Sequence, residues 1–210
     1  MSVSIEFHFD FGSPNAYLSH LVIPDIETRT GVKFEYVPVL LGGVFKITNN
    51  VSPTVSMNGI QNKSEYYELE TQRFLSKHNI STYQRNPFFP VNTLTIMRGA
   101  AYCRAHGGFT NYVDSVFAHM WRNPKQMSEP QIIAAALRES GLPGEEILAG
   151  ANTALVKQSL LSATNDSVAR GNFGSPTFFV GDEMFFGKDK LVDVEEAIRF
   201  RIQTEEGLTT

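Results

Sequence analysis

The sequence contains a single cysteine, Cys103, among its 210 residues. One cysteine excludes an internal disulfide and any metal site built from several cysteines. It also argues against a disulfide oxidoreductase, because that chemistry uses two thiols in one site. No two histidines have the spacing of metal ligands, so we expect no metal ion. With so little cysteine and no targeting segment, the protein is expected to be cytoplasmic.

Long apolar runs and long runs of one charge are also missing. No stretch approaches the 18 apolar residues that indicate a membrane span, so we expect no membrane partner. The formal net charge is -4, without a basic cluster, so nucleic acid is not expected as a partner either. The sixteen phenylalanines, beside one tryptophan, indicate a dry core first and an apolar pocket second.

What is present begins with a strand and a helix. Alternating apolar residues predict a strand from Val3 to Phe9, with His8 on its outward side. A tight turn, Asp10 to Ser13, then leads into a helix that Pro14 opens and Gly31 closes.

The middle of the chain adds a second strand and a series of helices. Val32 to Leu41 alternates again and predicts a strand parallel to the first, because a β-α-β unit favours a right-handed crossover. Gly42 to Pro53 is rich in Gly, Asn, Ser and Pro and is predicted to be a loop. From Ser64 to Gly171 we expect four or five helices, with Glu145 to Ala169 forming one helix or two.

The end of the chain returns to strands, at Thr177 to Val180 and Met184 to Phe186, followed by a last helix. This order predicts the α/β class, with a thioredoxin-like fold whose middle connection is expanded into an inserted all-α helical domain. We expect a discontinuous thioredoxin-like domain of residues 1–62 and 172–210, and a helical insertion domain of residues 63–171.

Ser13 is the first candidate for chemistry. Its simplest interpretation is an N-cap, because serine is favoured at that position. A helix N-terminus also stabilises thiolates and other anions, so a hydroxyl there can serve a bound anion. The sequence has no Gly-x-Ser-x-Gly motif, which argues against a serine hydrolase. A serine without a base is a poor nucleophile but a good hydrogen-bond donor.

Two further segments are candidates for binding. Pro176 either begins a strand or, with a cis bond to Ser175, exposes the Ser175 backbone to pair with a peptide as an added strand. Lys188 and Asp189 stand at the start of the last predicted helix. That helix is either an ordinary surface helix or one whose N–H groups receive a carboxylate while Asp189 receives an ammonium.

Three other residues are individually unremarkable. Asn50 and Lys63 flank the segment that leads into the helices, and each fits a solvated loop. Cys103 lies inside a predicted helix and is expected to be a packed thiol.

Five segments together resemble 2-hydroxychromene-2-carboxylate isomerases and kappa-class glutathione transferases, two groups of the DsbA-like thioredoxin superfamily. The resemblance covers nearly the whole chain, in the order of the family. Its segments are Phe9 to Leu18, Leu41 to Phe45 with Asn50, Phe89 to Thr93, Gly174 to Phe178, and Gly187 to Leu191.

The resemblance implies glutathione as cofactor and a small aromatic molecule as substrate. By resemblance, Ser13 would hold the glutathione sulfur, and Asn50 and Lys63 would reach its glycine end. The phenylalanine-rich helices would form an apolar pocket beside the sulfur.

The resemblance also assigns the second half of the site. Ser175, with a cis Pro176, would pair with the cysteinyl backbone of glutathione. Lys188 and Asp189 would hold the γ-glutamyl group. The family is commonly dimeric, so a homodimer is expected.

Three functions stay open at this point. The first is a glutathione-dependent cis–trans isomerase of an aromatic 2-oxo acid, acting through reversible addition of the thiolate. The second is a kappa-like transferase that conjugates glutathione to an electrophile. The third is a non-catalytic thioredoxin-fold protein that binds a peptide or a partner, which predicts no thermal stabilisation by glutathione.

Overall fold

The computed structural model describes residues 4–207 and contains one mixed, four-stranded sheet. Its order is β2-β1-β3-β4, with β2 parallel to β1, and β3 antiparallel to both β1 and β4. The strands are β1 (Ile5–Phe9), β2 (Glu35–Pro38), β3 (Thr177–Val180) and β4 (Glu183–Phe186). The β-α-β unit and the terminal hairpin are present as predicted, but β2 is shorter than the predicted strand Val32 to Leu41, whose last residue already begins a helix. Val3, predicted to join β1, lies outside the described residues.

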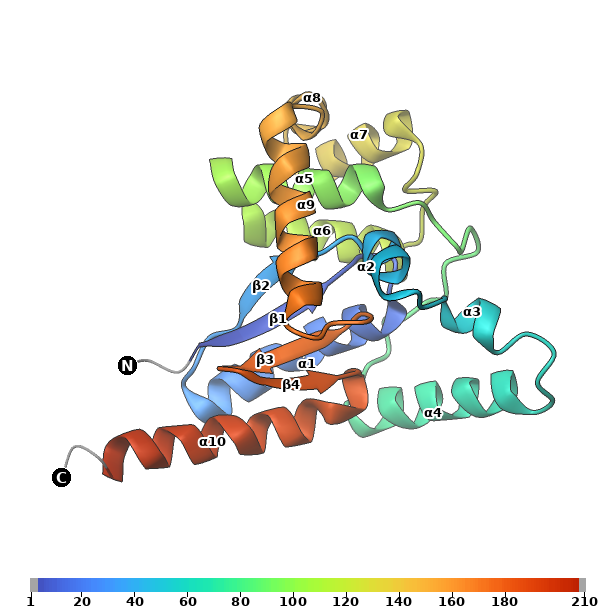
Figure 1. Cartoon of the computed structure of the whole chain (residues 1–210). Coiled ribbons are helices and arrows are strands. Elements are labelled where there is room, and N and C mark those ends of the chain that lie inside the picture. The colour runs from blue at the N-terminus through green and yellow to red at the C-terminus, as the bar shows by residue number, and fades with distance from the viewer. Residues whose placement is uncertain (1–3, 208–210) are drawn as a thin grey trace.

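Helices cover both faces of the sheet (Figure 1). α1 (Pro14–Thr30) and α10 (Leu191–Gly207) pack together on one face, and α9 (Ala154–Ala169) contacts β2 on the other. His8 is therefore buried, at 2% exposure, and the prediction that it faces outward was wrong. Alternation along β1 could not reveal α9, which covers His8 from a distant part of the chain.

The other helices lie between β2 and β3, apart from one short turn. That turn is a 3-10 segment, Lys188–Lys190, directly before α10. The helices are α2 (Leu41–Thr48), α3 (Pro53–Ser56), α4 (Lys63–Lys77), α5 (Leu94–His106), α6 (Phe109–Trp121), α7 (Pro130–Glu139) and α8 (Gly144–Ala151).

The segment Gly42 to Pro53 is not the loop that its composition predicts, because α2 occupies its first half. The N-cap residue, Leu40, offers no side-chain hydrogen bond. Instead, Oδ2 of Asp10 accepts the N–H of Leu41 at 2.8 Å and so satisfies a donor of the first turn. The cap comes from a distant residue, which local composition does not reveal.

Within the described residues, α4 to α9 are six helices where four or five were expected. α5 and α6 are separate because Gly107 and Gly108 have φ of 104° and 76°, values that glycine adopts readily. The segment Glu145 to Ala169 forms two helices, α8 and α9, with Thr153 as the N-cap of the second.

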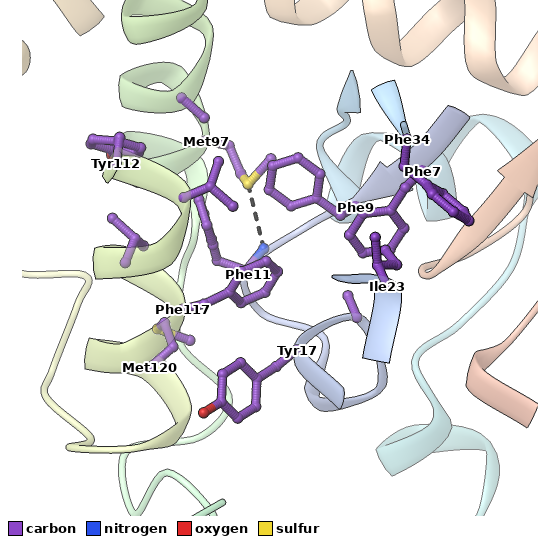
Figure 2. Packing of buried hydrophobic residues seen from close by; sticks show 14 of the residues in the cluster. Phe7, Phe9, Phe11, Tyr17, Ile23, Phe34, Met97, Tyr112, Phe117 and Met120 are labelled. Carbon is purple, nitrogen blue, oxygen red and sulfur yellow. Dashed lines mark hydrogen bonds between the residues drawn. The ribbon is translucent and has the colours of Figure 1, made fainter. Parts of the chain in front are cut away.

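A phenylalanine-rich core joins the sheet to the helices of the insertion (Figure 2). Phe9 on β1, Phe11 in the following turn and Phe117 on α6 are completely buried. The ring centroids of Phe11 and Phe117 are 4.8 Å apart. Burying each such side chain stabilises the fold by about 1.5–3 kcal/mol. The core interpretation of the phenylalanine content is thus confirmed, and the core holds the turn before Ser13 in place.

Backbone contacts strengthen this attachment. The indole N–H of Trp121 donates to the carbonyl of Phe11 at 2.7 Å, and the Phe11 N–H points at the Met97 sulfur, 3.5 Å away (Figure 2). The turn between β1 and α1 is therefore held by α5 and α6 as well as by its own strand.

Cys103 is buried on α5, as predicted, and burial raises the pKa of its thiol to about 12. Over residues 4–207, no three His, Cys, Asp or Glu side chains gather as metal ligands would. None of the helices in that range is long and apolar enough to cross a bilayer.

Candidate active site

Ser13 lies where β1 turns into α1 and is 5% exposed. Its Oγ accepts the N–H of Ala16 at 3.1 Å, which confirms the N-cap interpretation. The same Oγ donates to the backbone carbonyl of Ser175 at 2.8 Å, across 162 positions of sequence. The one hydroxyl proton of Ser13 is therefore directed at the segment that precedes β3.

The Ser175–Pro176 bond is cis, and Ser175 is half-buried. The Ser175 Oγ accepts the backbone N–H of Asp10 at 3.1 Å. The carbonyl of Pro176 accepts the N–H of Gly187 at 3.0 Å, which ties this segment to the turn before α10. Across residues 4–207, the backbone N–H of Ser175 has no hydrogen-bond acceptor. The structure thus brings Ser13, Ser175 and Pro176 together and leaves a backbone donor beside them.

Asp10, which the sequence did not single out, organises the turn in front of Ser13. Its side chain is completely buried, and its Oδ1 accepts the Gly12 N–H at 2.8 Å. Its Oδ2 accepts the Leu41 N–H at 2.8 Å and the Thr93 hydroxyl at 3.1 Å. Burial raises the pKa of this carboxyl against the opposing effect of these hydrogen bonds. Asp10 therefore joins the Ser13 turn to the starts of α2 and α5.

Asn50 lies beside the Ser175 segment, but its amide already has protein partners. Its Nδ2 donates to the carbonyl of Phe173 at 2.8 Å, and its Oδ1 accepts the N–H of Val51 at 2.8 Å. Lys63 is the first residue of α4 and is half-buried. Its side chain makes no hydrogen bond or ion pair within residues 4–207, so no direct bond joins it to Ser13.

Lys188 and Asp189 stand in the 3-10 turn that follows Gly187. Lys188 is only 4% exposed, and its Nζ donates to Oδ1 of Asp189 at 2.5 Å. The same Nζ lies 4.8 Å from the ring centroid of Phe74 on α4, a favourable cation–π position. The Asp189 side chain is 71% exposed. The ammonium is thus occupied inside the protein, whereas the carboxylate is accessible.

Both residues also line a cavity of about 250 Å³ between α1, α4 and α10. Neither Ser13 nor Ser175 lines that cavity. The structure therefore links Lys188 and Asp189 to Ser175 through Gly187 and Pro176, and not through a shared cavity.

The DsbA-like thioredoxin domain family matches residues 4–199, nearly the whole chain. The chain belongs to the DsbA-like thioredoxin family. Both the family resemblance and the predicted fold class are thereby confirmed. The sheet order, the helices inserted between β2 and β3, and the cis proline before β3 are all contained in the matched region.

Within the DsbA-like family, the chain is similar to curated 2-hydroxychromene-2-carboxylate isomerases. It is 28% identical over 199 residues to one from Pseudomonas putida, covering 92% of this chain and 93% of that protein. It is 24% identical over 196 residues to one from Sphingobium xenophagum, covering 91% and 95%. The similarity spans nearly the full length of each pair and supports an enzyme.

Solved structures agree on the fold. A 2-hydroxychromene-2-carboxylate isomerase structure superposes with a TM-score of 0.82 at 24% identity, covering 98% of this chain and 99% of that one. Pseudomonas aeruginosa DsbA superposes with a TM-score of 0.58 at 15% identity, covering 98% and 86%. These likenesses establish the DsbA-like architecture around Ser13.

Proposed function

We propose that this protein is a glutathione-dependent cis–trans isomerase of an aromatic 2-oxo acid. The observation that carries the proposal is the Ser13 hydroxyl, which lies at the N-terminus of α1 and 2.8 Å from the Ser175 carbonyl. The full-length similarity to 2-hydroxychromene-2-carboxylate isomerases supports the reaction class. When bound, glutathione would supply a thiolate whose addition makes the conjugated double bond of the substrate single and free to rotate, and whose departure restores the double bond in the other geometry.

The groups at Ser13 suit an anionic sulfur. Lowering a thiol pKa by about two units requires about 2.7 kcal/mol of preferential stabilisation of the thiolate. A partly buried helix N-terminus provides up to about 2 kcal/mol, and one hydrogen bond to a charged group about 1.5–3 kcal/mol. Ser13 and the N-terminus of α1 are together sufficient.

For the Ser13 hydroxyl to donate to the glutathione sulfur, it must give up its present hydrogen-bond acceptor. Ser13 has one hydroxyl proton, and it now points at the carbonyl of Ser175. If the hydroxyl turns to the sulfur, that carbonyl loses its donor, while the Ser175 N–H still needs an acceptor. A peptide backbone lying antiparallel to Ser175 satisfies both groups at once. The cysteinyl residue of glutathione offers such a backbone, so sulfur and amide are recognised together.

The remaining site residues are assigned to the two ends of glutathione. Asp189 is the accessible carboxylate for the γ-glutamyl ammonium, and Lys188 holds Asp189 through its short ion pair. Lys63, with its ammonium unpaired within residues 4–207, suits the glycine carboxylate, and Asn50 steadies the backbone at Phe173. We further propose a homodimer and a cytoplasmic setting, where thiols stay reduced.

Isomerisation of a 2-hydroxychromene-2-carboxylate followed by ultraviolet absorbance, with and without glutathione, tests the proposal. We expect turnover only with glutathione, and full recovery of the thiol at the end. Equal rates without glutathione would refute the mechanism. Steady consumption of glutathione with an aryl halide, without isomerisation, would establish the kappa-like transferase instead.

A melting scan separates both enzymes from the binding protein. Glutathione at 100 times its dissociation constant should stabilise the folded state by about 2.7 kcal/mol. An unchanged melting temperature at millimolar glutathione would favour the non-catalytic alternative.

A further inference from the structure

We propose that Asn172 is a positioning residue for the Ser175 segment, and that His8 fixes the orientation of Asn172 through the hydroxyl of Ser167. The proposal rests on the proposed function, since Ser175 belongs to the glutathione site described above. It concerns buried residues on the α9 side of the sheet that none of the roles assigned so far uses.

Asn172 shapes the segment that carries Ser175. It is 1% exposed, and its Oδ1 accepts the N–H of Gly174 at 2.8 Å and, at 2.9 Å, the hydroxyl of Thr177, whose proton is shared with the Gly174 carbonyl 3.0 Å away. These two contacts lie on either side of Ser175 and Pro176. The side chain therefore spans the segment and holds its two ends at a fixed separation.

The amide has only one workable orientation. Turning it over would place its NH₂ group against the N–H of Gly174, leaving two donors facing each other. In the observed orientation, Nδ2 donates to Oγ of Ser167 at 2.7 Å. Ser167 is 1% exposed, so an unsatisfied amide there would have no water to bond. The acceptor at Ser167 thus determines which way Asn172 points.

The direction of the next hydrogen bond follows from the number of protons. Ser167 has a single hydroxyl proton, and its Oγ lies 2.7 Å from Nδ1 of His8. Nε2 of the ring lies 2.8 Å from Oε2 of Glu6, a carboxylate that can only accept, so a neutral His8 carries its proton on Nε2. Its Nδ1 then has a free lone pair, and we assign the Ser167 proton to it. Glu6 in turn accepts from Arg170 at 2.7 Å.

In the neutral ring this single tautomer sets the chain of donors, from Ser167 to His8 and from His8 to Glu6. Burial lowers the pKa of His8, an effect larger than the opposing one of Glu6. The ring lines a cavity of about 400 Å³ between the sheet, α5 and α9. Its charged neighbours around this cavity are Glu6 on β1, Glu35 on β2, Arg104 on α5, Asp166 on α9 and Arg170 just after α9.

Protonation of His8 would reverse this chain. Both ring nitrogens would then be donors, so Nδ1 would donate to Ser167 and no longer accept from it. The Ser167 hydroxyl would lose its acceptor and have to turn, while its oxygen took two donors, Nδ1 of His8 and Nδ2 of Asn172, on its two lone pairs. The expected consequence is a looser Ser175 segment and weaker glutathione binding in acid.

The first test compares Ser167→Ala with Ser140→Ala. Ser140, an exposed residue directly after α7, offers a control, because its Oγ also meets a buried histidine, 2.9 Å from Nε2 of His119. We expect Ser167→Ala to raise the KM and dissociation constant for glutathione about tenfold, the usual size of a lost buried hydrogen bond, with little change in kcat. Ser140→Ala should leave both constants unchanged. Equal glutathione affinity in the two variants would overturn the proposal.

The second test does not depend on glutathione. Hydrogen exchange at the Gly174 amide reports whether Asn172 still holds the segment. Exchange should be about tenfold faster in Ser167→Ala than in the wild type or Ser140→Ala. Unchanged protection would overturn the positioning role. If the wild-type protein fails to bind glutathione while this difference appears, the proposed function fails and the positioning role stands.

The third test uses pH and a variant that keeps the hydrogen bond. In His8→Asn, the amide oxygen can take the place of Nδ1 and accept from Ser167 without gaining a proton in acid. Because burial holds the pKa of His8 below the ordinary value of 6.5, wild-type affinity for glutathione should fall only at a pH below that value, and the fall should be absent in His8→Asn. The same fall in both proteins would exclude His8 as its cause and overturn that part of the proposal.

Discussion

α1 and α9 begin with the same kind of N-cap, but the two capping hydroxyls have different surroundings. Both N-caps have an extended backbone, and the hydroxyls of Ser13 and Thr153 accept an N–H from the first turn, at 3.1 Å and 3.4 Å. The Thr153 proton goes to Gly150, three residues earlier, whereas the Ser13 proton goes to Ser175 on another segment. A cap is a local property, but a site requires a second segment to meet it.

The largest expected effect is on enzymatic activity, to which the Ser13 hydroxyl should contribute and the Thr153 hydroxyl should not. Ser13→Ala removes the donor to the sulfur, which is worth about 1.5–3 kcal/mol for a charged acceptor. We expect kcat/KM for glutathione-dependent isomerisation to fall about 100-fold, which is about 2.7 kcal/mol. Thr153→Ala should retain wild-type activity, because its hydroxyl meets no second segment. Similar losses in both variants would show that capping, and not the contact with Ser175, accounts for the effect.

The Ser13 cap, unlike the Thr153 cap, is preceded by a turn that a buried carboxylate organises, that of Asp10. Asp10→Asn places an NH₂ group among the three donors that Asp10 now satisfies, the N–H groups of Gly12 and Leu41 and the Thr93 hydroxyl. In either orientation of the amide, at least one of these buried or part-buried donors loses its acceptor. We expect a loss of about 2 kcal/mol in the free energy of unfolding, measured in urea.

A variant without any loss of unfolding free energy would contradict this role for Asp10. Asn92→Ala is a useful control, since among residues 4–207 the Asn92 Oδ1 accepts only the exposed N–H of Leu94. Its effect should stay well under that of Asp10→Asn, because an exposed donor can bond to water.

Cysteine in place of each capping residue allows the pKa of a thiol to be compared at the two helix N-termini, without glutathione. In Ser13→Cys the sulfur would be buried at the N-terminus of α1, where we expect a pKa about one unit below the ordinary value of about 8.5. In Thr153→Cys the position is exposed, so the shift should be less than half as large. Ultraviolet absorbance of the thiolate measures both, and Cys103, with a pKa near 12, does not interfere. Equal shifts would mean that the two helix N-termini stabilise a thiolate equally and that the surroundings of Ser13 add nothing.

The same contrast explains what the sequence could predict. Ser13 as a cap, the two parallel strands and the terminal hairpin follow from periodicity and turn chemistry, which are local. The family resemblance placed Ser175 and Pro176 opposite Ser13, and the structure brings them together. Neither source indicated Asp10 or Asn172, because a buried polar residue is recognisable only from partners that are distant in sequence. An acidic residue directly after an apolar strand was the one available signal.

The errors have the same origin. α2 was missed because its first turn is satisfied by Asp10, 31 positions away. His8 was placed outside because the helix that covers it follows much later in the chain. In both cases, the deciding contact joins the strand that precedes Ser13 to a segment whose position only the fold determines.

The smallest expected effect is on the free energy of unfolding, at the exposed N-cap residue Thr153. Thr153→Ala should cost about 1 kcal/mol in the free energy of unfolding, because the N–H of Val156 loses its side-chain acceptor. Thr153→Asp should recover most of this loss, since a carboxylate accepts the same N–H and is favoured by the helix dipole. Urea unfolding at low ionic strength measures both changes. If Thr153→Ala leaves the free energy of unfolding unchanged, the Thr153 hydroxyl does not stabilise α9. Ser13 and Thr153 would then not share a stabilising role as N-caps.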